Sequence, residues 1–314
     1  MCPYSFALLY PSRYMNINYL LEKFCQESHY FSGRSPETIK RYRANITFFI
    51  QQQNIVKIDA VNRKQIMSFF AFGRSEREWK SATYRTYYMS LKVFFRWCVK
   101  EKYLKENPIL GLELPKLDAA IPKGLSLEKA TALLDWAYHM PSESRLQRIR
   151  NQALFATFIY AGLRKSELLN LKLGDIDLIG DTIFVSKGKG RKDRLVPICM
   201  NLKEILSRYL FERNKAKKNT IYFFTSTKQD RAFTKAGLKH LTKKIRQHAN
   251  ISFTIHGLRH TFATLMIEGG CDIYSLSKMM GHSNIKTTTI YLSASVEHLR
   301  GQIAKHPLDV HTTW

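Results

Sequence analysis

The sequence has few cysteines and arranges none of them as a close pair. Its 5 cysteines among 314 residues are scattered, and none form a C-x-x-C pair. An odd, scattered set argues against a disulfide framework and against a zinc knuckle. We therefore expect a protein of a reducing compartment and place it in the cytoplasm.

Long apolar runs and an export signal are also lacking. The longest apolar stretch without a charged side chain runs from Asn151 to Leu163, which is shorter than the roughly 20 residues that a transmembrane helix needs. The first ten residues carry no positive segment ahead of their short apolar run, unlike a secretory signal. We expect neither a membrane span nor export.

Acidic residues are scarce relative to basic ones. The chain has 25 Asp and Glu against 50 Lys and Arg, a formal net charge of +25. Such an excess suits DNA, RNA or an anionic membrane surface, and a basic protein without such a partner remains an alternative at this point. With 45% hydrophobic residues the chain has material for packed cores, which excludes a disordered basic tail.

The first hundred residues have the pattern of a helical bundle. Ser35 followed by Pro36 is typical of a helix start, and apolar residues then recur at helical spacing. A second apolar stripe lies within 81–100, and shorter helical patterns lie within 17–25 and 62–72. We interpret the aromatic residues of these stripes as core, because packing explains their spacing.

Residues 108–125 have the composition of a linker, since proline and glycine recur there without periodicity. We expect two domains, over 13–107 and 126–300, and a tail over 301–314.

The second domain is expected to be mainly α-helical with a small β-hairpin or sheet. Residues 181–186 and 195–198 are β-branched or aromatic and flank a turn rich in lysine and glycine, which predicts a hairpin. Helical patterns begin at Leu127 and resume from Leu202.

Two clusters in this domain combine basic residues with glycine. Arg164 follows a glycine-terminated apolar helix, where a guanidinium is unfavourable unless it meets an anion. Its spacing to Glu167 is also that of an ordinary ion pair on a helix surface. The second cluster, from Ser186 to Arg194, is a cationic turn that suits either a DNA groove or a solvated hairpin tip.

A third cluster places His256 and Arg259 on one helix face. His256 and His260 also have the spacing of the zinc-binding H-E-x-x-H helix, but Gly257 stands where the glutamate base is needed. We therefore reject a zinc site.

A fourth cluster contains His282 and, nine residues later, Tyr291, which alone would be read as packing. The order arginine, lysine, H-x-x-R-H, G-H, tyrosine resembles the tyrosine recombinase (phage integrase) family, and most of all Xer-type recombinases and small integrases of mobile elements. The resemblance covers about 126–299, and the helical bundle before it looks like the family's SAM-like core-binding domain.

The resemblance implies catalysis without metal, other cofactor or ATP. Tyr291 would attack a DNA phosphodiester and leave a 3′-phosphotyrosyl bond, with Lys189 as general acid, or Lys187 if the turn has another register. Ser293 departs from the histidine that many relatives carry. The implied catalytic residues are Arg164, Lys189, His256, Arg259, His282 and Tyr291.

The resemblance also implies a two-domain, C-shaped DNA clamp. It would act on double-stranded DNA recombination sites as a homo-tetramer, or as a hetero-tetramer with a paralogue, through a Holliday junction. The alternatives are a type IB topoisomerase-like nicking-closing enzyme and a DNA-binding regulator on a recombinase scaffold. The full set of catalytic residue types argues against the regulator.

Overall fold

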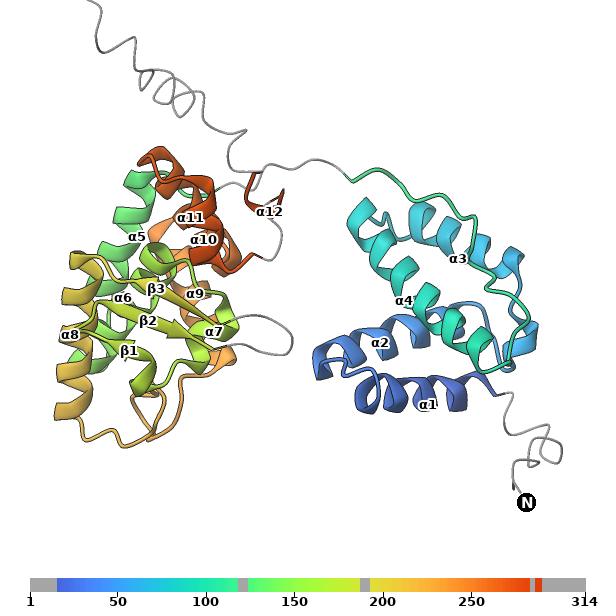
Figure 1. Ribbon diagram of the computed structural model, residues 1–314, viewed down its shortest axis with the longest axis horizontal. Helices are drawn as coiled ribbons and strands as arrows, with labels where there is room; N and C mark the ends of the chain where they lie inside the picture. Colours follow the sequence, from blue (N-terminus) through green and yellow to red (C-terminus); the bar gives the residue numbers. More distant parts are fainter. Residues whose placement is uncertain (1–15, 118–123, 187–192, 283–285, 290–314) are drawn as a thin grey trace, which may run out of the picture. The chain divides into compact units, whose positions relative to one another are not determined.

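The protein divides into two compact units (Figure 1). The computed structural model describes residues 16–117, 124–186, 193–282 and 286–289. The first unit spans Met1–Ala119 and the second Ala120–Trp314.

Within residues 16–117 the first unit has four α-helices, which confirms the bundle that the sequence predicted. Ser35 caps the second helix by accepting from the backbone N–H of Thr38. Asn62 and Gln65 form a reciprocal capping box at the start of the third. The helices are α1 (Ile17–Tyr30), α2 (Pro36–Gln52), α3 (Arg63–Ser75) and α4 (Ser81–Lys100), with a short 3-10 turn at Ile58–Ala60.

Aromatic side chains form much of this unit's core. Phe49 is fully buried, and its ring meets those of Phe69 and Phe95 edge to face, with centroids 5.1 and 5.9 Å apart. Trp79 stacks on Tyr87 at 4.2 Å. The aromatic stripes are therefore core, because such pairs gain from geometry as well as from burial.

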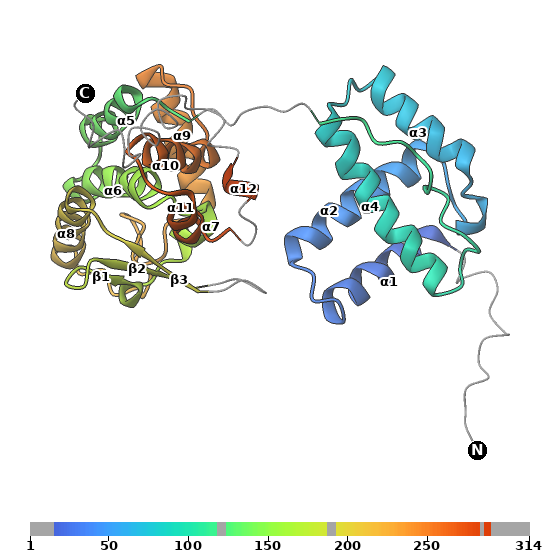
Figure 2. The same cartoon turned by 45° about the horizontal axis from the view of Figure 1, so that its top comes forward.

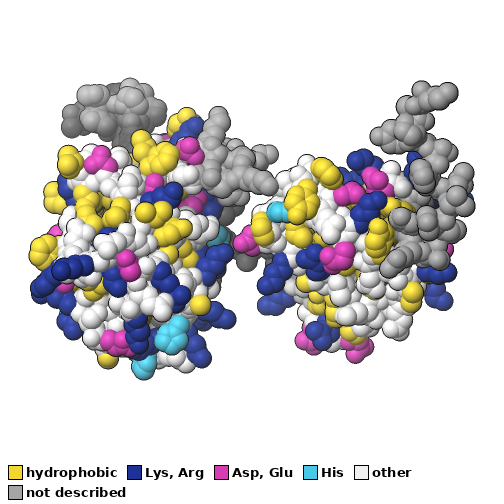
Figure 3. All heavy atoms as spheres, turned by 90° about the horizontal axis from the view of Figure 1, so that it is seen from below, with side chains coloured by type: hydrophobic (Ala, Val, Ile, Leu, Met, Phe, Trp, Pro, Cys, Tyr) yellow, Lys and Arg dark blue, Asp and Glu magenta, His cyan; other side chains and the backbone are white. Residues whose placement is uncertain are grey.

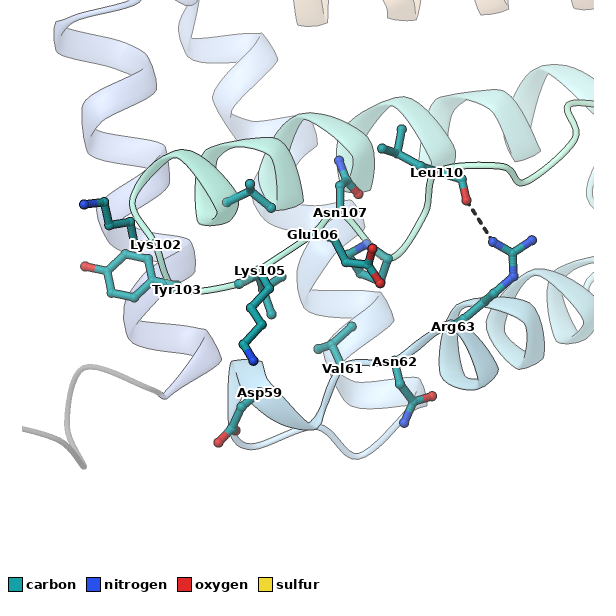
Figure 4. Close-up of a pocket in the computed structure, with 13 residues that line it drawn as sticks. Asp59, Val61, Asn62, Arg63, Lys102, Tyr103, Lys105, Glu106, Asn107 and Leu110 are labelled. Atoms are coloured by element: carbon teal, nitrogen blue, oxygen red, sulfur yellow. Dashed lines mark hydrogen bonds between the residues drawn. The ribbon is translucent and has the colours of Figure 1, made fainter.

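The stretch that follows α4 packs on the same unit. Ile109 is fully buried, Nη1 of Arg63 donates to the Leu110 carbonyl at 2.9 Å, and Nε of Arg85 donates to the Pro115 carbonyl at 2.9 Å. This stretch and the segment before α3 line a hollow with a volume of about 910 Å³. Figure 4 shows the side chains that line it.

The second unit consists of helices and a small antiparallel sheet of order β1-β2-β3. Ile183 pairs with Val196 and both are buried, as the hairpin prediction required. A third strand, β1, was not predicted. In the described part of this unit the elements are α5 (Leu127–His139), α6 (Arg145–Ala161), α7 (Lys165–Asn170), β1 (Ile176–Asp177), β2 (Thr182–Val185), β3 (Arg194–Pro197), α8 (Met200–Lys215), α9 (Lys235–Ala249), α10 (Ile255–Glu268), α11 (Ile273–Met280) and α12 (Lys286–Thr289).

Helix α6 runs through the centre of this unit, and the helices α5, α8 and α10 pack against it (Figures 1 and 2). Ser144 caps its start, and it ends at Gly162, which adopts the left-handed conformation with φ of 59°. Leu154, Phe155 and Phe158 are fully buried, which explains the long apolar stretch in the sequence. None of the helices in the described part of the chain combines the length and hydrophobicity of a transmembrane span.

We expect Gly162→Ala to lower the free energy of unfolding by about 2 to 4 kcal/mol. The residue has positive φ, and a Cβ atom there would lie 2.2 Å from Cδ1 of Phe262, inside the packed core. Gly174→Ala is the matched control, because nothing lies within 4 Å of a Cβ added there. Urea unfolding of both variants gives the comparison, and equal stabilities would contradict a rigid contact at Gly162.

Candidate active site

Helix α7 begins at Lys165, shortly after α6 ends, and its N-cap residue Arg164 forms a charged pair with Glu167. The backbone N–H of Arg164 donates to Oε2 of Glu167 at 2.7 Å, and Nη1 of Arg164 donates to Oε1 at 2.8 Å. The ion pair that the spacing suggested therefore exists, but it is not a surface pair. The Glu167 side chain is only 13% exposed and that of Arg164 26%.

A second arginine binds the same carboxylate from the sheet. Arg194, the first residue of β3, donates through Nη1 and Nη2 to the two carboxylate oxygens of Glu167 at 3.0 and 2.8 Å. Its Nε donates to the Met279 carbonyl at 2.7 Å. The sequence grouped Arg194 with a cationic turn that suits either a DNA groove or a solvated hairpin tip, but its side chain is only 11% exposed and points inward to Glu167 and Met279.

A third guanidinium, that of Arg259 on α10, lies next to the pair. Its side chain is 2% exposed, and Nη1 donates to the Gly162 carbonyl at 2.6 Å and lies 3.9 Å from Oε2 of Glu167. Nη2 donates to the Met280 carbonyl. Arg259 thus joins the end of α6 to the end of α11.

The carboxyl end of α11 is the meeting point of the three guanidiniums. The carbonyls of Met279, Met280 and Gly281 each accept an N–H from a different arginine. Carbonyls in the last turn of a helix have no partner within the helix, and cations are favoured there. The helix terminus therefore helps to fix where the positive charge lies.

The two histidines of the predicted site, His256 and His282, lie beside this charge. The His256 ring meets that of His260 edge to face with centroids 4.5 Å apart, and Nδ1 of His282 lies 2.8 Å from Oγ1 of Thr288. Burial and then the charge of Arg259 lower the pKa of His256, and the same causes lower the pKa of His282 to about 4. Both rings are therefore neutral at pH 7.

The structure brings together four of the predicted site residues, namely Arg164, His256, Arg259 and His282. Lys189 and Tyr291 lie outside the described residues. Sequence reasoning missed the central role of Glu167, whose only signal was its spacing, and the inward course of Arg194, for which there was none. Within the described ranges, no three or more His, Cys, Asp or Glu side chains form a cluster suited to a metal ion.

Comparisons with known proteins cover nearly the whole described chain. Residues 127–298 match the phage integrase family, and residues 20–105 match the phage integrase N-terminal SAM-like domain. The chain is 30% identical to tyrosine recombinase XerD of Listeria monocytogenes, over 88% of this chain and 94% of that one. It is 34% identical to tyrosine recombinase XerA of Thermococcus onnurineus, over 85% and 88%.

Solved structures agree. A XerA recombinase crystal structure is 27% identical over 92% of this chain and 99% of that one, with a TM-score of 0.51. The XerH recombinase bound to its difH substrate is 22% identical over 91% and 83%, with a TM-score of 0.70, and shows a shared fold. These findings confirm the family resemblance and the mainly helical fold expected from the sequence.

The Glu167 carboxylate predicts a pH-dependent contribution to stability. The bonds from Arg194 and Arg164 outweigh burial and hold its pKa at about 2, below the usual 4.5. A lowered pKa stabilises the fold above about pH 4.5, and this stabilisation is lost as the pH falls towards 2. At pH 7 we expect Glu167→Gln to lower the free energy of unfolding by about 3 kcal/mol or more, since it leaves buried cations unpaired.

Urea unfolding between pH 3 and 7 measures this effect. The difference in the free energy of unfolding between the wild type and Glu167→Gln should become smaller below pH 4.5. Glu204→Gln is the control, because Glu204 is 70% exposed in a surface pair with Arg208 and should change stability by no more than about 0.5 kcal/mol at any pH. A difference for Glu167→Gln that does not vary with pH would contradict the ion-pair assignment.

Proposed function

The chain belongs to the phage integrase family, as a tyrosine site-specific recombinase, and we propose that it cleaves and rejoins double-stranded DNA through a 3′-phosphotyrosyl intermediate. The observation that carries the proposal is the convergence of Arg164 and Arg259, with His282 beside them, at the ends of α6 and α11. The relatives found are recombinases and integrases, so a topoisomerase or a regulator is not favoured.

The nucleophile in this proposal is Tyr291. A phenol has a pKa of about 10 and is a weak nucleophile at neutral pH, so a base must take its proton. His256 suits that role, because burial and the nearby arginine charge keep its imidazole neutral and able to accept. The Tyr291 oxygen then bonds to phosphorus while the bond from phosphorus to the 5′-oxygen breaks.

The arginines stabilise the charge that grows on the phosphate. Two guanidiniums that donate to the non-bridging oxygens stabilise a pentacoordinate transition state more than the ground state, which is the difference that speeds a reaction. Arg164 is fixed by Glu167 and Arg259 by the Gly162 carbonyl, so little reorganisation is needed when DNA binds. His282 adds a further hydrogen bond.

Lys189 is proposed as the general acid that protonates the departing 5′-oxygen. The ester energy is kept in the phosphotyrosyl bond, so rejoining needs no ATP, and the proposed chemistry uses no metal. Attack of a 5′-hydroxyl on that bond reverses the step and releases Tyr291.

Basic surfaces suit both units to DNA. Helix α9 has no acidic residue, and Lys239, Lys243 and Arg246 are exposed along it. On the first unit Lys40 and Arg96 are exposed. Figure 3 shows Lys and Arg side chains spread over both units, among fewer Asp and Glu. Such side chains bind phosphates without reading sequence.

Assembly on DNA is the remaining part of the proposal. Relatives of known structure include XerH bound to its difH substrate and a lambda integrase dimer bound to a core site. We propose that four copies of this chain, or two copies with two of a paralogue, hold two sites and exchange strands through a Holliday junction. A plasmid carrying two sites separates this from simple nicking and closing, which changes only its linking number.

The covalent intermediate provides the test of the function. Site DNA selected from random sequences, and nicked so that the cleaved product diffuses away, should trap a protein–DNA adduct with the wild type. Tyr291→Phe should form no adduct while its affinity for the site stays within about threefold, since one hydroxyl is lost. Tyr274→Phe is the control, because Tyr274 is an exposed tyrosine of α11 and should form the adduct normally. An adduct with Tyr291→Phe would place the nucleophile elsewhere.

Lys189 has its own test. Lys189→Ala should cleave ordinary DNA slowly but recover on DNA whose 5′-bridging oxygen is sulfur, because a thiolate leaves without a proton. Arg164→Ala should not recover, since its role is on the non-bridging oxygens. Recovery of Lys187→Ala in place of Lys189→Ala would move the acid by two residues, and recovery of neither would reject lysine as the acid.

A further inference from the structure

A carboxylate in a site that binds phosphate poses an electrostatic problem. Glu167 orients Arg164, yet its negative charge offsets half of the charge that Arg164 and Arg259 together offer a phosphodiester. At separations of 3 to 4 Å in a partly buried site this effect is large. A further positive group must compensate the charge of the Glu167 carboxylate if both arginines are to bind the DNA phosphate with their full charge.

Arg194 has the geometry for this task. It forms a two-pronged pair with both carboxylate oxygens, whereas the Arg164 guanidinium reaches only one of them. Its side chain is 11% exposed, less than the 26% of Arg164, and its Nε is engaged by the Met279 carbonyl. Arg194 therefore faces the carboxylate and the helix end, and Arg164 is the more accessible of the two.

The position of Arg194 also ties separate elements together. It is the first residue of β3, the last strand of the sheet. Its guanidinium joins that strand to α7 through Glu167 and to the end of α11 through Met279. A Cβ on Gly281 would lie 3.0 Å from Cδ of Arg194, so the side chain lies directly against the residue before His282.

We propose that Arg194 is a positioning residue of the recombination reaction, which takes up the charge of Glu167 and holds its carboxylate so that Arg164 and Arg259 act on the DNA phosphate. The inference rests on the proposed function. With Arg194 the cluster of three arginines and one glutamate has a net charge of 3 − 1 = +2, and without it 2 − 1 = +1. A lysine supplies the charge but not three donors in one plane.

The test compares cleavage rates of Arg194→Gln and the wild type on saturating site DNA. We expect the variant to cleave of the order of 10- to 100-fold more slowly, with its affinity for the site within about threefold. Arg208→Gln is the control, because Arg208 lies on α8 in an exposed pair with Glu204, and this variant should cleave at the wild-type rate.

Two further arms separate charge compensation from a loss of structure. A methylphosphonate at the cleaved position lacks one charged oxygen. On this DNA the cleavage rate of Arg194→Gln should come at least severalfold closer to the wild-type rate than it does on ordinary DNA. Adding Glu167→Gln to Arg194→Gln should raise the rate above that of Arg194→Gln alone, since the uncompensated charge is removed. A merely structural role predicts equal losses on both substrates and no gain in the double variant.

The outcomes are distinct from failure of the proposed function. Absence of an adduct with the wild type would reject the function itself. A normal adduct with the wild type, together with either a wild-type rate for Arg194→Gln or equal losses on both substrates, would overturn the role of Arg194. If Arg194→Gln does not fold, Arg194→Lys carries the same substrate comparison, with a smaller loss of the same kind expected.

Discussion

The carboxylate of Glu167 is the interaction on which the rest of the site depends. Three guanidiniums come to it from the N-cap of α7, from β3 and from α10, which are separate segments of the sequence. Like charges at such separations repel strongly in a partly buried environment, and the negative charge among the arginines, together with the carbonyls at the helix ends, offsets this repulsion. The arginines in turn keep the carboxylate ionised, and for this reason the pKa of Glu167 is lowered. The fold of the second unit and the charge of its site are thus stabilised by the same contacts.

Helix ends supply the second constraint. Both α6 and α11 stop at a glycine in the left-handed conformation, Gly162 with φ of 59° and Gly281 with φ of 62°. Because the helices end there, the Gly162 carbonyl accepts from Arg259 and the Gly281 carbonyl accepts from Arg164. These bonds fix two guanidiniums that long, flexible side chains would otherwise leave free to move. A site supported by helix termini is held more rigidly than one built on loops, and fixed donors stabilise a transition state better than donors that must reorganise.

The sequence predicted what local patterns encode. Helical spacing marked the four helices of the first unit, and β-branched and aromatic residues on either side of a lysine- and glycine-rich segment marked the hairpin of β2 and β3. Strand β1 was not predicted, because a segment of two residues is too short to show a periodic pattern. Its pairing of Ile176 with Ile183 is seen only in the folded structure. The inward course of Arg194 escaped for a similar reason. Its partners lie 27 and 85 residues away, so in sequence it looked like the other basic residues of the turn. The family motif did identify Arg164, His256, Arg259 and His282, because it relates residues that are far apart in the sequence but belong to one site.

The same arginine charges also set the state of the proposed base. In the protein without DNA, burial and the charges of Arg259 and Arg164 lower the pKa of His256 and keep its ring neutral. A bound phosphodiester brings one negative charge to those guanidiniums and offsets part of their effect on the imidazole. The pKa of His256 should therefore rise when the substrate arrives, which makes the neutral ring a stronger proton acceptor at the moment when Tyr291 must lose its proton. On this argument the positive cluster does more than hold the phosphate, because the substrate's own charge strengthens the base that attacks it.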